Sequence, residues 1–208
     1  MLSRLLAKPE NVFWERRLGI ETRASEAKDP GTNIEHEYYA TVSYRALFRM
    51  LEAAEMKPSD VFVDIGCGKG RAVCCAALGK IAQAVGIDDM AELCQKAREN
   101  AEQLRGRQAN VTIIQGKAQE FDYSQGSVFY LFNPFGPVTL KEVLAKIGEA
   151  VAAHRKPIKI IYANPVYESV FSETPWLERY MQMDRISALT PGLKASFWRS
   201  KESTNARP

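Results

Sequence analysis

A regular alternation of short apolar runs with helical stretches is the feature that most constrains the fold. Runs rich in Val, Ile and Phe, typical of buried strands, occupy residues 61–65, 82–88, 110–115, 127–132 and 158–163. Helical stretches lie between them at 70–79, 89–105, 138–153 and 166–172. This alternation predicts β-α-β units with right-handed crossovers, and hence a parallel sheet covered by helices on both faces.

Residues 177–200 depart from this alternation. The segments "LERYMQMDRI" (177–186) and "LKASFWRS" (193–200) have strand character, and the turn-forming "SALTPG" between them leaves no room for a helix. We therefore expect an antiparallel hairpin here. The predicted fold class is α/β, a Rossmann-like three-layer sandwich whose mostly parallel seven-stranded sheet ends in a C-terminal antiparallel hairpin.

The residues before the alternation are predicted to form an N-terminal helical lid or extension over 1–55, followed by the main domain over 56–202. We expect an amphipathic helix at the start, and a second helix from about Glu35 to Ala54 after the turn-rich "KDPGTN". A chain of 208 residues buries enough surface to fold without a disulfide or a metal.

Net charge, apolar runs and the numbers of cysteines and histidines argue against several classes of protein. The formal charge of +3 is too small to indicate nucleic acid, and no apolar run approaches the about 20 residues that a membrane span needs. The four cysteines contain no CxxC pair and there are only two histidines, so no metal site is expected. Unpaired cysteines suggest reduced thiols and a cytoplasmic location. The oligomeric state is left open.

The stretch "VFVDIGCGKG" (61–70) places Gly66, Gly68 and Gly70 directly after a strand. Glycine lets the backbone turn sharply and approach a ligand closely, and the following helix offers free N–H groups. A dinucleotide fingerprint would need its third glycine one position later, and no P-loop motif is present. The carboxylate of Asp64 would repel a pyrophosphate but would suit a cationic amino group.

This loop resembles the cofactor signature of the class I S-adenosylmethionine-dependent methyltransferases, and the resemblance extends over about residues 55–200, hairpin included. It implies S-adenosyl-L-methionine as the cofactor. The residues implied to hold its methionine part are Asp64, Gly66, Cys67, Gly68 and Gly70. Asp88, with its neighbour Asp89, matches the position that grips the ribose hydroxyls, where a carboxylate can accept two hydrogen bonds. Helix capping by Asp88 is compatible with this role.

The third strand is followed by "QGKAQEF", where the family commonly has Gly-Asp-Ala. Gly116 and Ala118 match this pattern, whereas Lys117 replaces the acid. The resemblance then implies that the backbone N–H of Ala118 and the side chain of Gln119 contact the adenine. Lys117 is expected to be a solvated surface residue.

After the fourth strand, "FYLFNPFGP" (129–137) resembles the Asn-Pro-Pro-Tyr/Phe box of methyltransferases that act on amino or amide nitrogens. Asn133, Pro134 and Phe135 are the candidate catalytic residues, although Phe135 stands where the box has proline and Gly136 where it has an aromatic residue. The resemblance implies that Asn133 accepts hydrogen bonds from the target nitrogen. Lysine methyltransferases outside the SET family also fit. The other interpretation is a simple break at the strand end, and Asn164 after the fifth strand is either pocket lining or a turn.

The predicted function is methyl transfer to a nitrogen of a protein side chain or a small molecule. The alternatives are another acceptor such as RNA, or a non-catalytic cofactor-binding scaffold. An NAD-dependent oxidoreductase is disfavoured by the glycine spacing, and a hydrolase by the lack of G-x-S-x-G. The sequence does not identify the methyl acceptor.

Overall fold

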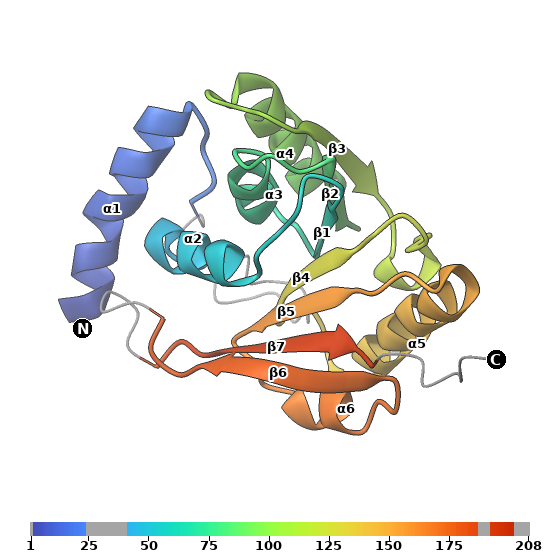
Figure 1. Cartoon of the computed structure of the whole chain (residues 1–208). Coiled ribbons are helices and arrows are strands. Elements are labelled where there is room, and N and C mark those ends of the chain that lie inside the picture. Colours follow the sequence, from blue (N-terminus) through green and yellow to red (C-terminus); the bar gives the residue numbers. More distant parts are fainter. Residues whose placement is uncertain (1, 24–40, 187–191, 202–208) are drawn as a thin grey trace, which may run out of the picture.

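The computed structural model describes residues 2–23, 41–186 and 192–201. These form three layers, with a seven-stranded sheet in the middle and helices on either side (Figure 1). The strands are β1 (Val61–Ile65), β2 (Gln83–Asp88), β3 (Asn110–Gln115), β4 (Val128–Phe132), β5 (Lys159–Ala163), β6 (Leu177–Met183) and β7 (Ala195–Ser200). Their order is β3-β2-β1-β4-β5-β7-β6. Strands β1 to β5 are mutually parallel, and β7 lies antiparallel between β5 and β6. The predicted fold class and hairpin are confirmed.

Helices cover both faces of this sheet (Figure 1). They are α1 (Leu2–Leu18), α2 (Tyr44–Ala53), α3 (Arg71–Ala76), α4 (Ala91–Gln103), α5 (Pro137–His154) and α6 (Glu168–Ser172), with a 3-10 turn η1 (Ala118–Glu120). The buried residues of α2 and α3 share one core cluster with β1, β5 and β7, and those of α5 and α6 share the second cluster on the opposite face. The sheet therefore has an apolar core on each side.

Strand β1 shows why the sequence folds this way. Its residues from Phe62 to Ile65 are all buried, as expected for a strand covered on both faces. Phe62 belongs to the cluster under α2 and α3, whereas Val63 and Ile65 belong to the cluster under α5. Because side chains alternate along a strand, Asp64 faces the α3 side together with Phe62.

The start of the second predicted helix was wrong. The prediction began near Glu35, but α2 begins at Tyr44. Ser43 is extended, and its hydroxyl accepts a hydrogen bond from the backbone N–H of Ala46 at 3.3 Å. Ser43 is therefore the N-cap, and the helix begins at the residue after it. Residues 35–40, including the tyrosines at 38 and 39, lie outside the described residues.

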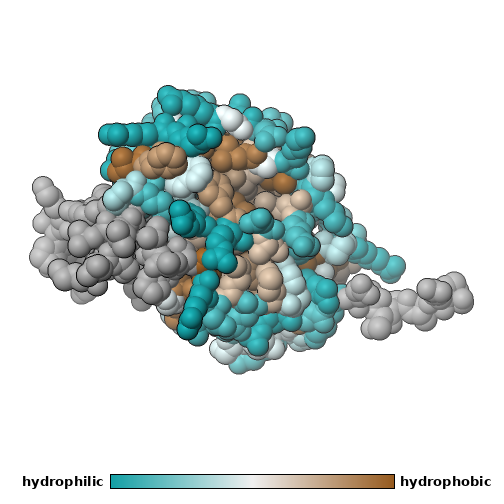
Figure 2. All heavy atoms as spheres, turned by 60° about the vertical axis from the view of Figure 1, so that its left-hand side comes forward, coloured by the Kyte–Doolittle hydropathy of each residue, from teal (hydrophilic) through white to brown (hydrophobic). Residues whose placement is uncertain are grey.

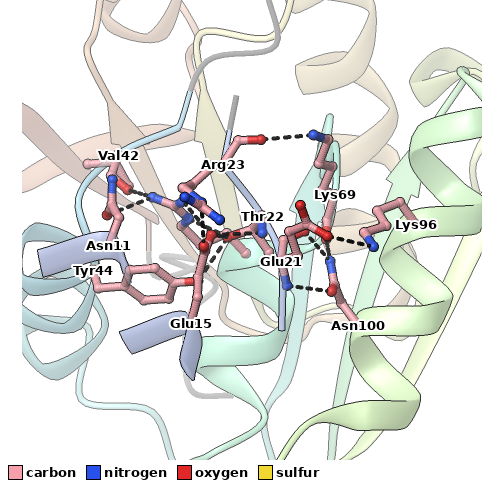
Figure 3. A network of polar contacts seen from close by, with 11 residues as sticks. Asn11, Glu15, Glu21, Thr22, Arg23, Val42, Tyr44, Lys69, Lys96 and Asn100 are labelled. Carbon is pink, nitrogen blue, oxygen red and sulfur yellow. Dashed lines mark hydrogen bonds and ion pairs between the residues drawn. The ribbon is translucent and has the colours of Figure 1, made fainter. Parts of the chain in front are cut away.

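The N-terminal segments are joined to α3 by a buried polar cluster around Arg71. Figure 3 labels its members Glu15, Thr22, Val42 and Tyr44. Arg71 donates from Nε to the hydroxyl of Thr22 at 2.8 Å and from Nη1 to the carbonyl of Val42 at 2.7 Å. Its Nη2 lies 3.5 Å from a carboxylate oxygen of Glu15, and its guanidinium lies 4.4 Å from the ring centre of Tyr44. Side chains or backbone from α1, from the segment after it and from α2 thus meet at the first residue of α3.

The side of the molecule that carries α1 in Figure 1 is turned forward in Figure 2. Apolar residues gather across the middle of this face, and hydrophilic residues border them. Within α1 itself, the side chain of Phe13 is 58% exposed. The docking of α1 consequently leaves apolar surface open to solvent and relies in part on the buried polar cluster.

We predict that Arg71→Met lowers the free energy of unfolding by about 3 kcal/mol, because it leaves the buried Glu15 carboxylate without this cation. Urea unfolding measures this loss. The matched control is Lys141→Met, whose ion pair with Glu173 is exposed and whose loss should cost less than about 1 kcal/mol. Equal losses of unfolding free energy in the two variants would contradict the stabilising role of the buried Arg71.

Candidate active site

The loop after β1 has the backbone conformation that its glycines allow. Gly66, Gly68 and Gly70 have φ angles of 78°, 52° and 79°. These values lie in the left-handed region, which residues with a Cβ rarely adopt. Gly70 also donates its N–H to the carbonyl of Cys67 at 2.8 Å, which closes a turn directly before α3. The glycine spacing noted in the sequence therefore follows from three left-handed residues at alternate positions.

Two of these glycines are in close contact with neighbouring elements. A Cβ on Gly66 would lie 2.5 Å from the Cβ of Pro134, and one on Gly70 would lie 3.1 Å from the Cβ of Ala97 in α4. The first contact joins the end of β1 to the end of β4, where the strand order reverses. Ligands of open α/β sheets bind at such a point, outside the carboxyl ends of the strands. Asn133, which precedes Pro134, is thus brought beside the glycine loop.

Asp88 ends β2 and bonds to this loop. One carboxylate oxygen accepts from the N–H of Gly68 at 2.8 Å, and the other accepts from the N–H of Met90 at 3.0 Å. Burial raises the pKa of Asp88, and the two backbone hydrogen bonds partly oppose this. Each carboxylate oxygen retains a lone pair for a further donor. Asp89 is exposed beside it.

Asp64 lies beneath the loop and is 3% exposed. In the sheet it pairs with Gly86 of β2 and Tyr130 of β4. Burial raises its pKa well above the ordinary value, the charge of Asp88 raises it further, and a hydrogen bond from the backbone of Val73 in α3 lowers it. Two carboxylates with raised pKa values therefore lie close together at the carboxyl ends of β1 and β2, as in many functional sites.

The side chain of Cys67 points away from the open side of the loop. A Cβ on Gly86 would lie 2.8 Å from its Sγ, so the thiol packs on the backbone of β2. Burial raises the pKa of this thiol. Any contact of Cys67 with a ligand would thus come from its backbone. The cysteines at 67, 74, 75 and 94 are all free and buried, as the sequence suggested.

The end of β3 leads into η1, which begins with Ala118 and Gln119. Both residues are half-buried, and the carbonyl of Ala118 accepts a hydrogen bond from the Tyr123 hydroxyl at 2.8 Å. Lys117 is exposed, with its ammonium 3.8 Å from Glu120. The interpretation of Lys117 as a solvated surface residue agrees with this position.

At the end of β4, Asn133 has a left-handed backbone with φ of 48°. Its side-chain oxygen accepts a hydrogen bond from the Tyr162 hydroxyl at 3.2 Å, and that hydroxyl accepts from the N–H of Tyr167 at 3.2 Å. Burial raises the pKa of Tyr162, which keeps it a neutral donor. Pro134 and Phe135 follow as half-buried residues.

Sequence reasoning missed Tyr162. The only signal for it was its position near the end of β5, in register with Leu131 of β4. Asn164, two residues later, also has a left-handed backbone, with φ of 51°, and its N–H donates to the carbonyl of Lys194 at 2.8 Å. Its side chain is exposed. The turn interpretation of Asn164 agrees with this geometry.

Comparison with known families identifies the chain. Residues 56–172, more than half of the sequence, match the model of a methyltransferase domain. The chain belongs to the class I S-adenosylmethionine-dependent methyltransferases. The resemblance inferred from the glycine loop and the terminal hairpin is therefore confirmed.

One curated relative of this methyltransferase is a protein-lysine N-methyltransferase of Saccharolobus islandicus. It is 31% identical over 133 residues, which cover 61% of this chain and 81% of the relative. Among solved structures, an RNA methyltransferase of Salinibacter ruber in complex with S-adenosyl-L-homocysteine matches with a TM-score of 0.58 and 24% identity, covering 81% and 97% of the two chains. The B. subtilis M1A22 tRNA methyltransferase matches with a TM-score of 0.60 and 13% identity, covering 78% and 68%. At these identities the structural matches show the fold alone.

S-adenosyl-L-methionine is the cofactor of this methyltransferase, and the site fits it. The left-handed glycines at 66, 68 and 70 let the backbone turn sharply at the end of β1, where it can approach a ligand closely. Asp88 is half-buried and has lone pairs left for a diol. The part of the chain that the structure describes contains no group of three or more His, Cys, Asp or Glu able to hold a metal ion. Nor do its described helices include one long and apolar enough to cross a bilayer.

We predict that Asp64→Asn stabilises the fold while weakening cofactor binding. Because the folded pKa of Asp64 is raised, its contribution to stability is fully present below its unfolded pKa near 3.8 and is lost as pH rises through the folded pKa. Asparagine has no such loss, so the gain in unfolding free energy should grow as the pH rises from about 4 towards the folded pKa of Asp64. Urea unfolding across this range measures it. A gain that does not change with pH would contradict the prediction.

Proposed function

We propose that this methyltransferase transfers its methyl group to a nitrogen nucleophile, the side-chain amine of a protein lysine, and that Asn133 positions this nitrogen. The observation that carries the proposal is the placement of the Asn133 amide. Asn133 follows β4, its neighbour Pro134 packs on Gly66 of the glycine loop, and the hydroxyl of Tyr162 in β5 bonds to its amide oxygen. The relative named as a protein-lysine N-methyltransferase supports the same acceptor.

We further propose how the cofactor is held. Its methionine part would lie against Asp64, Gly66, Cys67, Gly68 and Gly70, its ribose against Asp88 and Asp89, and its adenine against Ala118 and Gln119. When bound, S-adenosyl-L-methionine supplies a methyl group on a positively charged sulfur. Buried carboxylates near this charge favour binding of a cation.

The proposed catalytic residues are Asn133, Pro134 and Phe135, and their role is orientation. The lysine ammonium must first lose a proton to solvent. The amine lone pair would then form the N–CH3 bond while the S–CH3 bond breaks, so the nitrogen must approach in line with that bond. The oxygen of Asn133 keeps one lone pair after accepting from Tyr162, so it can accept an N–H of the substrate. Phe135 is half-buried beside it and offers an apolar surface to the aliphatic part of a lysine side chain. Such positioning is worth several kcal/mol of the barrier.

Exposed apolar side chains near this edge of the sheet support a macromolecular substrate. Val138, at the start of α5 after β4, is 71% exposed, and Val166, after β5, is 57% exposed. Both follow strands whose carboxyl ends form the site. We propose that these two side chains belong to the surface that the substrate protein contacts.

The proposal includes the division of the chain into residues 1–55 and 56–202. We propose that the first part acts as a helical extension that helps enclose the cofactor. One contact supports this proposal: the ammonium of Lys69 in the glycine loop donates a hydrogen bond to the carbonyl of Arg23, in the segment after α1, at 2.8 Å.

The acceptor is tested by incubating the protein and a cell extract with cofactor that carries a labelled methyl group, and then separating protein, RNA and small molecules. We expect the label in protein, at lysine side chains when the peptides are mapped by mass spectrometry. Label in the RNA fraction alone would favour the RNA alternative. Binding of the cofactor without any transfer would favour a non-catalytic scaffold.

We predict that Asn133→Gly lowers kcat by about 100-fold, because it removes the group that orients the nitrogen. Glycine tolerates the left-handed backbone at this position, so the fold and the Kd for S-adenosyl-L-homocysteine should be unchanged. Steady-state kinetics and calorimetry measure the two quantities. The matched control is Arg155→Gly, another left-handed position, exposed after α5, which should leave kcat unchanged. Full activity in Asn133→Gly would refute the role of Asn133.

A further inference from the structure

A buried asparagine in α4 also bonds to the glycine loop. Asn100 is 1% exposed. Its side-chain oxygen accepts from the N–H of Glu21 at 2.8 Å, and its Nδ2 donates to the carbonyl of Glu21 at 3.0 Å and to the carbonyl of Lys69 at 2.9 Å (Figure 3). One amide thus links α4, the segment after α1 and the middle of the glycine loop.

These bonds fix the peptide between Lys69 and Gly70 at both of its polar atoms. Asn100 holds the carbonyl, and the carbonyl of Cys67 holds the N–H at 2.8 Å. Ala97, one turn earlier in α4, is small enough for Gly70 to pack against it. The surface of α4 therefore shapes the loop between the Asp88 contact and the start of α3.

This restraint matters because glycine loses more conformational freedom on ordering than any other residue. A loop with three left-handed glycines would have to be ordered when the cofactor binds, unless the protein orders it beforehand. Ordering in advance removes that cost from the binding free energy. Asn100 is suited to this task because an apolar side chain at the same position would leave the carbonyls of Glu21 and Lys69 without this partner.

We propose that Asn100 is a positioning residue for the cofactor. Its amide holds the glycine loop in the conformation that binds S-adenosyl-L-methionine and fixes the backbone of Glu21 beside that loop. Asn100 acts through the Lys69 carbonyl. The proposal concerns cofactor binding alone and does not depend on which nucleophile accepts the methyl group.

The test is Asn100→Ala, with S-adenosyl-L-homocysteine as the probe in calorimetry. We expect its Kd to rise about tenfold, the effect of about one hydrogen bond. The KM for S-adenosyl-L-methionine should rise in parallel, while kcat at saturating cofactor stays at the wild-type value. In the cofactor-free protein, hydrogen–deuterium exchange over residues 66–72 should become faster. Where Asn100→Ala does not fold, Asn100→Ser retains a hydroxyl donor and should show the same changes to a smaller extent.

The matched control is Lys96→Met, one turn earlier in α4. Lys96 lies 3.2 Å from the carboxylate of Glu21, so this change removes another link between the same two segments without touching the Lys69 carbonyl. Its Kd for the probe and its exchange over residues 66–72 should match the wild type. A wild-type Kd in Asn100→Ala, or an equal rise of Kd in Lys96→Met, would overturn the proposal.

Discussion

The hydrogen bond between the Gly68 backbone and the Asp88 carboxylate joins the two strand ends on which the rest of the site depends. It holds a left-handed loop at the end of β1 against the end of β2. Pro134 packs on this loop from β4, and Asn100 restrains it from α4. Burial raises the pKa of Asp64, and the charge of the nearby Asp88 raises it further. Two carboxylates therefore lie close together where we propose that the cationic cofactor binds, at a cost in stability that is typical of functional sites.

Much of this architecture was predictable, because its causes are local in the sequence. Buried parallel strands need continuous apolar runs, and these runs stood out between the helical stretches. The loop was predictable because each left-handed position in it requires glycine. The position of Asp88 near the loop was predictable because it ends the next parallel strand, β2, and the carboxyl ends of parallel strands meet at one edge of the sheet. The start of α2 was not predictable in this way, because Ser43 caps the helix inside a pattern that continues upstream.

The residues that escaped prediction act through contacts between distant segments. Asn100 bonds to a residue 79 positions away, and in the sequence it is only one more polar residue of a charged helix. The sequence around Arg71 gives no sign that this cation is buried, yet contacts with Glu15, Thr22 and Val42 bury it at the start of α3. Tyr162 is linked to Asn133 only through the pairing of β4 with β5. No local pattern carries this information, because it arises from the tertiary arrangement.

The position of β7 has a consequence for synthesis of the chain. β7 is inserted between β5 and β6, although it follows both in sequence. Until residues 195–200 have left the ribosome, β5 exposes an unpaired edge and β6 lacks the strand on which it pairs. Such edges are open to pairing with other chains. A nascent chain that already contains the whole glycine loop and Asn133 would consequently still carry an aggregation-prone edge, which closes only when this late segment is inserted.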